Sequence, residues 1–236
     1  MYSPYAPPAA PPQHYGPTPF YRPLGGLTTA AIIAVIVTVP VHLATNALVM
    51  AVDPGAEDAS LPAAFALLGA AAITVAVNLA ACVIFLMWLH RAATNVRAFG
   101  HQGLEFTPGW CVGWWFVPFA HLVKPLRAMQ EVWRASDPDA LNALDGGYDW
   151  TWRKSPLAAT MGAWWGAWII SGILDRVSGK IDDPATGGAI GITAALVSGI
   201  AAVLLVPIMR QLAARQEASW AKLHARHVGA APYRAA

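Results

Sequence analysis

Four long apolar stretches, separated by shorter polar segments, dominate the hydrophobic pattern of the chain. They cover residues 24–52, 62–90, 156–174 and 187–209. A helix of about 20 apolar residues crosses the hydrocarbon core of a bilayer. The pattern therefore predicts an all-α, polytopic membrane protein with four spans.

A fifth apolar segment, residues 110–123, is too short to be a simple span. A helix rises about 1.5 Å per residue, so this segment would reach roughly 21 Å in a core of about 30 Å. Pro118 and His121 also interrupt it. We expect a re-entrant or interfacial element here, with a bundle of five or six spans as the alternative.

The distribution of basic residues favours the four-span arrangement. Loops rich in Lys and Arg stay on the cytoplasmic side. If the fifth segment does not cross, 13 of the 15 Lys and Arg residues lie inside, together with both termini, whereas a crossing segment leaves 10 inside. Backbone at membrane depth must be covered by protein, because lipid cannot satisfy its polar groups.

Composition agrees with a membrane protein. The chain is 56% hydrophobic and 12% charged, with a mean hydropathy of +0.45, whereas soluble domains contain about 25% charged residues. The net charge of +2 gives no indication of nucleic acid as a partner. Cys82 and Cys111 both lie in apolar segments, which fits neither a disulfide framework nor a metal site.

The chain divides into three parts. Residues 1–23 form a Pro- and Tyr-rich segment, which predicts a disordered cytoplasmic tail that serves as a tether or as a ligand for a protein partner. Residues 24–209 form the transmembrane domain. Residues 210–236 form a basic, amphipathic tail, expected to be a helix lying on the cytoplasmic surface.

Three histidine or asparagine side chains lie in the interior of the predicted spans: His42, Asn46 and Asn78. His42 and Asn46 share a helix face, because residues four apart are neighbours on a helix. Polar groups at this depth must face other helices or a cavity. Interhelical hydrogen bonds are the simpler interpretation, and a polar pathway is the alternative.

Basic and aromatic residues gather around the fifth segment. Cationic side chains near aromatic faces bind anionic headgroups or anchor the segment through cation–π contacts. We predict either structural anchoring or a site for a ligand or lipid at the cytoplasmic boundary. The candidates are His90, Arg91, Asn95, Arg97, Trp110, Trp114, Trp115, His121 and Lys124.

The block from Trp88 to Ser136 resembles an uncharacterised bacterial membrane family, domain of unknown function 4328. The resemblance rests on His90-Arg91, the Phe106-Thr-Pro-Gly-Trp110 entry, the Gly113–Phe119 run, Lys124-Pro125 and Glu131-Val-Trp133. This chain has His121 where the family pattern has Asn. The resemblance implies a multi-span membrane protein, often with a Pro-rich N-terminal tail, and implies no activity.

These features lead to three functional hypotheses. The first is a membrane interaction or scaffold protein in the plasma membrane, in contact with lipids and able to form a homo-oligomer. The second is a transporter or channel for small solutes or lipids. The third, an enzyme, is disfavoured because no catalytic motif occurs, and the seven histidines show no HxxxH or HExxH spacing for a metal or haem, so no cofactor is expected.

Overall fold

The computed structural model describes residues 20–52, 60–101, 103–141 and 151–229, and within these ranges the regular structure is entirely helical. The elements are α1 (Gly25–Ala51), α2 (Leu61–Ala98), α3 (Pro108–Gly113), η1 (Trp114–Phe116), η2 (Ala120–Leu122), α4 (Lys124–Ala135), η4 (Thr151–Lys154), α5 (Met161–Ser178) and α6 (Pro184–Gly229).

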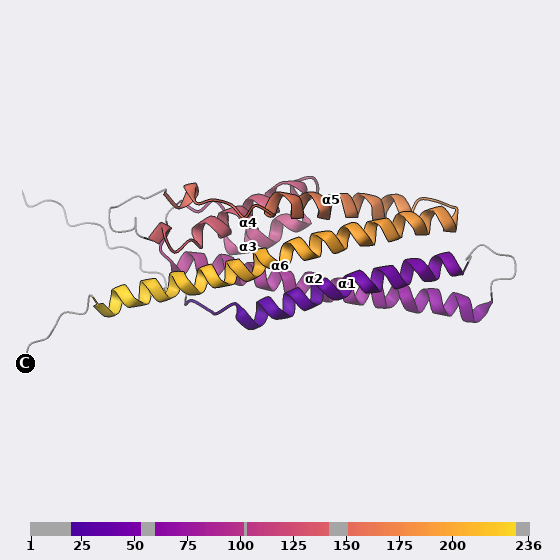
Figure 1. The fold of residues 1–236 in the computed structure, drawn as a ribbon, viewed down its shortest axis with the longest axis horizontal. Coiled ribbons are helices and arrows are strands. Elements are labelled where there is room, and N and C mark those ends of the chain that lie inside the picture. Colours follow the sequence, from indigo (N-terminus) through magenta and orange to yellow (C-terminus); the bar gives the residue numbers. More distant parts are fainter. Residues whose placement is uncertain (1–19, 53–59, 102, 142–150, 230–236) are drawn as a thin grey trace, which may run out of the picture.

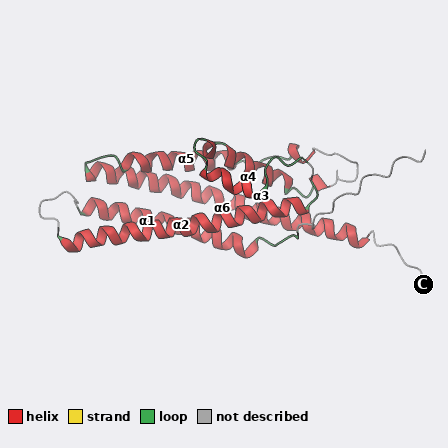
Figure 2. Cartoon of the chain, turned by 180° about the vertical axis from the view of Figure 1, so that it is seen from behind, coloured by secondary structure: helices red, strands yellow, loops and turns green. Residues whose placement is uncertain are grey.

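The long helices form an elongated bundle (Figure 1). α1 packs against α2 and α6, and α6 packs against α5, so the helices follow the order α2, α1, α6, α5. The end of α1, the start of α2 and the connection from α5 to α6 lie at one end of the bundle. The start of α1, the end of α6 and the helix α4 lie toward the other end, as the view from behind also shows (Figure 2).

Three helices, α1, α2 and α6, are long and apolar enough to cross a membrane. The fourth predicted span is weaker, because α5 has only 18 residues and carries Asp175 and Arg176 in its last turns. It also begins later than predicted, at Met161. The preceding segment is not helical, and the Trp133 indole donates a hydrogen bond to the carbonyl of Pro156 over 2.9 Å.

The fifth segment folds back on itself. α3 and η1 lead into a turn, and η2 and α4 return; we call residues 108–123 the hairpin. At its tip, the Ala120 N–H donates to the carbonyl of Pro118 over 2.7 Å, and Phe119 has φ 60° and ψ −41°. This is a γ-turn with positive φ, a rare and strained conformation for a residue other than glycine.

Helix α6 differs from the sequence prediction. Residues 210–229 continue α6 without a break instead of forming a separate helix on the membrane surface. Leu212, Gln216 and Ser219 are all fully buried. The reason is that α6 extends beyond the apolar bundle and packs there against α2 and the end of α4. Residues 230–236 lie outside the described part of the chain.

The predicted N-terminal tail ends a few residues earlier than expected. Residues 1–19 lie outside the described part, but residues 20–23 already contact the bundle. Tyr21 stacks on Trp220 with ring centroids 5.1 Å apart, and Leu24 is fully buried. The ordered chain thus begins before α1.

Small residues allow α6 to approach α1 closely. A Cβ atom added at Gly191 would lie 2.0 Å from Oδ1 of Asn46, and one at Gly199 would lie 3.3 Å from Val39. A second pair of small residues, on α5, does not pack against another described element. Gly162 and Gly166 on α5 have no atom within 4 Å of an added Cβ.

Candidate functional site

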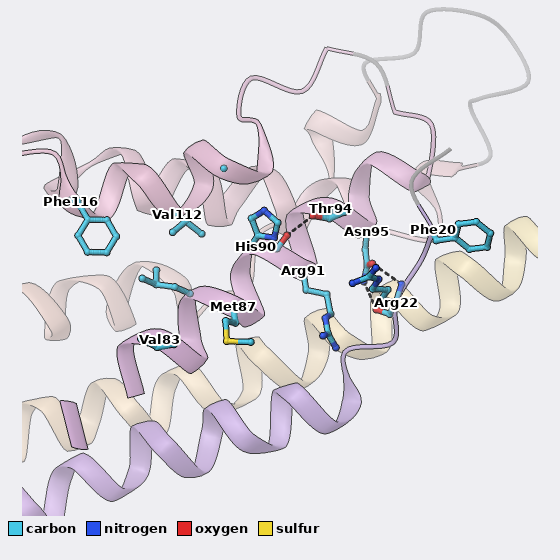
Figure 3. A pocket seen from close by; sticks show the side chains of 12 residues that line it. Phe20, Arg22, Val83, Met87, His90, Arg91, Thr94, Asn95, Val112 and Phe116 are labelled. Carbon is cyan, nitrogen blue, oxygen red and sulfur yellow. Dashed lines mark hydrogen bonds between the residues drawn. The ribbon is translucent and has the colours of Figure 1, made fainter. Parts of the chain in front are cut away.

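A groove of about 720 Å³ runs along the second half of α2, and we call it the boundary groove (Figure 3). Its walls come from α2, from the hairpin and from the chain that leads into α1. The lining residues are Phe20, Arg22, Val83, Leu86, Met87, His90, Arg91, Thr94, Asn95, Gly109, Val112 and Phe116.

The groove changes in character along α2. Val83 and Met87 are exposed apolar side chains, and Phe116 of the hairpin, 68% exposed, faces the same stretch. One turn further along the helix follow His90 and Arg91, which project to different sides of α2 (Figure 3). The groove is therefore apolar at one end and basic at the other.

Asn95 fixes the N-terminal wall of the groove. Its amide nitrogen donates to the carbonyl of Arg22 over 2.8 Å, and its Oδ1 accepts the Arg22 N–H over 2.9 Å (Figure 3). Asn95 is fully buried. Among the predicted site residues it thus has a structural role, holding Arg22 beside the groove.

Behind Asn95 lies a buried polar network that the sequence reasoning missed. Gln216 of α6 accepts from Asn95 over 2.9 Å, and donates to the carbonyl of Ala92 over 2.9 Å and to Ser136 over 3.0 Å. Ser219 donates to the carbonyl of Ser136 over 3.1 Å. Leu212, Gln216 and Ser219 recur at helical spacing, so this face of α6 carried a readable signal.

The predicted basic cluster does not come together as one site. Arg97 donates to the carbonyl of Phe106 over 2.9 Å. Lys124 pairs with Glu105 over 3.3 Å and lies 5.5 Å from the ring centroids of Phe106 and Trp114. These two cations close the hairpin at its base, so they anchor it structurally.

The tryptophans of the hairpin pack against one another and against the bundle. Trp110, 52% exposed, lies beside Trp114 with centroids 4.7 Å apart. Trp115 makes edge contacts with Phe85 of α2 and with Trp165 and Trp168 of α5. The Trp165 indole also donates to the carbonyl of Leu122 over 3.0 Å. The hairpin is thereby wedged between α2 and α5.

His121 lies in a second cavity of about 600 Å³, which we call the outer vestibule. This cavity also contains His42 and Asn78, two of the polar residues predicted within the spans. The Asn78 amide nitrogen lies 2.7 Å from Nε2 of His42, so the predicted interhelical hydrogen bond is present. Asn46 instead donates to the carbonyl of His42 over 2.9 Å, within α1.

Two carboxylates order the end of the bundle near α4. Glu131 accepts the N–H groups of Glu105 and Phe106 over 2.7 and 3.0 Å, and burial raises the pKa of Glu131. Asp137 pairs with Arg215 over 2.7 Å and accepts a hydrogen bond from Ser155. Burial would raise the pKa of Asp137, but these partners outweigh it and hold that pKa below its ordinary value.

The comparison with protein families gives a match over residues 50–214, described as Domain of unknown function (DUF4328). The chain belongs to this family. The DUF4328 match includes α2, the hairpin, α4, α5 and most of α6, and thus most of the lining of both cavities. Phe20 and Arg22 of the boundary groove and His42 of the outer vestibule lie outside the matched residues. Comparisons with curated proteins and with solved structures found no match.

Within the described part of this DUF4328 chain, no group of three or more His, Cys, Asp or Glu residues could hold a metal ion. The groove instead combines an apolar floor with basic side chains at one end. This arrangement suits an amphiphile with an anionic head.

Proposed function

We propose that this chain is a multi-pass protein of the plasma membrane that binds anionic phospholipids of the cytoplasmic leaflet in the boundary groove. α1, α2 and α6 supply three spans, and α5, which lies beside α6, supplies a fourth. The excess of Lys and Arg at the end that holds α4 supports a cytoplasmic position for both termini.

The observation that carries this proposal is the position of Arg91 on α2. The helix has no charged residue from Leu61 to His90, and Arg91 lies about 45 Å along the helix from its start. A bilayer including its headgroups is about 40–45 Å thick. Arg91 therefore comes to headgroup level when the start of α2 lies at the opposite surface.

The groove has the polarity that a phospholipid requires. Met87 and Val83 lie on the membrane side of Arg91, at the depth of acyl chains, and Phe116 adds an apolar wall from the hairpin. Arg91 and Arg22 make no ion pair within 4 Å among the described residues, unlike Lys124, Arg215 and Lys222. Their charges remain available to a phosphate group.

Lipid binding to the purified protein tests this proposal. Native mass spectrometry should show more bound phosphatidylglycerol than phosphatidylcholine on the wild type. Arg91→Ala and Arg22→Ala should each reduce the preference, since each basic residue near an anionic surface contributes about 1 kcal/mol. Arg127→Ala is the matched control, because Arg127 is an exposed cation of α4 outside the groove.

Two results would contradict the proposal. One is an equal loss of phosphatidylglycerol in Arg127→Ala and Arg91→Ala, which would indicate a general charge effect. The other is an unchanged preference in the double variant Arg22→Ala/Arg91→Ala, which would place the lipid elsewhere.

A further inference from the structure

The outer vestibule lies between α2 and α5, the two helices at the ends of the row α2, α1, α6, α5. α2 packs on α1 and α5 packs on α6, whereas α2 and α5 make few direct contacts. The hairpin fills part of the space between them, and its tip, Pro118 and Phe119, lines the vestibule. The boundary groove contacts the hairpin through Phe116, so the hairpin separates two different cavities.

The vestibule gathers polar side chains at a depth where they are costly. His42 lies about 14 Å along α1 from its end at Ala51, and Ser198 about 21 Å along α6 from Pro184. Both line the vestibule, together with Asn78 and His121. Polar groups inside a membrane usually face a water-filled or ligand-filled cavity. The lining therefore indicates a polar occupant.

Some hydrogen-bonding atoms that line the vestibule have no partner among the described residues. The Asn78 amide nitrogen donates one hydrogen to the carbonyl of Thr74 over 2.8 Å and directs the other to His42 Nε2, so both of its hydrogens are used. Its oxygen, Oδ1, has no hydrogen bond within the described part, and neither does the ring of His121. The Asn78 oxygen can accept a hydrogen bond from a solute, and the neutral ring of His121 can donate from one nitrogen and accept at the other.

The occupant is most simply an uncharged molecule. The charged residues that line the vestibule are Asp175 and Arg176, both in the last turns of α5 near the connection to α6. Deeper in the cavity the lining consists of amide and hydroxyl groups, the two imidazoles, aromatic rings and aliphatic side chains, with no carboxylate, ammonium or guanidinium group among the described residues. An ion there would lose its hydration without a charged partner, which is costly at low dielectric.

We propose that the outer vestibule binds a small, uncharged, hydrogen-bonding solute of polyol or sugar type, which enters from the side of the α5–α6 connection. Asn78, His42 and His121 supply hydrogen bonds, and the faces of Trp168 and Phe119 supply apolar contact. A volume of about 600 Å³ is of the size that small-molecule sites have. This site is independent of the lipid groove.

Thiol labelling tests access to the vestibule. In a protein with Cys82 and Cys111 replaced by Ala, Ser198→Cys should react with uncharged 2-hydroxyethyl methanethiosulfonate added from outside. Leu196→Cys is the matched control, since Leu196 lies two residues away on α6 and is 55% exposed on an apolar surface. A thiol in lipid does not ionise and should react far more slowly.

Protection from labelling tests the class of ligand. Glycerol, ribose and glucose are the probes, and at ten times its Kd a bound probe should slow the labelling of Ser198→Cys about tenfold. Asn78→Leu should abolish protection while leaving the thiol reactive. Equal labelling of Ser198→Cys and Leu196→Cys, protection by choline or glutamate instead, or no protection by any of the three probes would each overturn the proposal.

Discussion

Asn95 and Arg22, 73 positions apart in the sequence, are joined by two hydrogen bonds between the amide of one and the backbone of the other. Two neighbouring β-strands exchange N–H and C=O hydrogen bonds in the same way, but here the Asn95 side chain takes the place of one backbone. It places the ordered start of the chain against α2 and positions the wall of the boundary groove before α1 begins.

Replacing Asn95 should destabilise the protein strongly. Asn95→Leu preserves the approximate volume but leaves the Gln216 oxygen and the Arg22 backbone without partners. Each unsatisfied buried group costs about 1–3 kcal/mol, so we expect a loss of about 2–5 kcal/mol. Thermal unfolding in detergent measures it. Thr94→Ala is the control, because Thr94 is only partly buried and bonds the carbonyl of His90 within its own helix; an equal loss there would contradict the role of the network.

The Asp137–Arg215 pair should make stability depend on pH. The pKa of Asp137 is lowered in the folded state from its ordinary value of 3.8. Its stabilising contribution is therefore present above about pH 4 and is lost as the pH falls through the folded pKa. Asp137→Asn should lower the free energy of unfolding by about 1–3 kcal/mol at pH 7, and the difference from wild type should shrink toward pH 3.

Asp139→Asn provides the comparison for this pH effect. The Asp139 side chain is 89% exposed, and its carboxylate lies 3.7 Å from Lys222. Exposed pairs contribute little. If the wild type still has the higher free energy of unfolding by the same amount at pH 3, the charge of the Asp137 carboxylate is not the cause of the difference.

The contact between α1 and α6 should fail when Gly191 gains a methyl group. The new Cβ would meet Asn46 at 2.0 Å and Ser178 Oγ at 3.0 Å, so Asn46 would have to move and give up its bond to His42. We expect Gly191→Ala to cost about 1–3 kcal/mol. Gly162→Ala, on an open face of α5, should not destabilise the protein, because alanine has a higher helix propensity than glycine. Equal effects of the two changes would disprove close packing at Gly191.

Membrane topology can be tested at the two ends of α6. In a variant without Cys82 and Cys111, a cysteine at Ala185 should react with an impermeant thiol reagent in whole cells, whereas one at Ala221 should react only after lysis. The reason is that 13 of 15 basic residues lie on the side of Ala221. Labelling of Ala221→Cys in intact cells would reverse the orientation and place the boundary groove outside.

The helical bundle and the reversal at residues 110–123 could be predicted because both depend on the length of apolar segments. The separation of the candidate site residues into different cavities and contacts could not be predicted. Lys124 and Arg97 find partners at Glu105 and Phe106, just before the hairpin. The γ-turn at Phe119 carries His121 into a different cavity from His90. Phe gives no sequence signal for positive φ, and Asn95 contacts Arg22 through the backbone of Arg22, so no pattern of side chains reveals either feature.

Phe119 should be replaceable by glycine with a gain in stability. Its φ of 60° is strained for a side chain with a Cβ but ordinary for glycine, and the side chain is 86% exposed, so little packing within the chain is lost. Relief of such strain is worth about 1–3 kcal/mol, so Phe119→Gly should raise the unfolding temperature. Phe116→Gly is the control: Phe116 is also exposed but lies in η1 with helical backbone, where glycine should destabilise by about 1 kcal/mol. A lower unfolding temperature for Phe119→Gly would mean that the ring itself holds the hairpin tip in place, against α5 or against lipid.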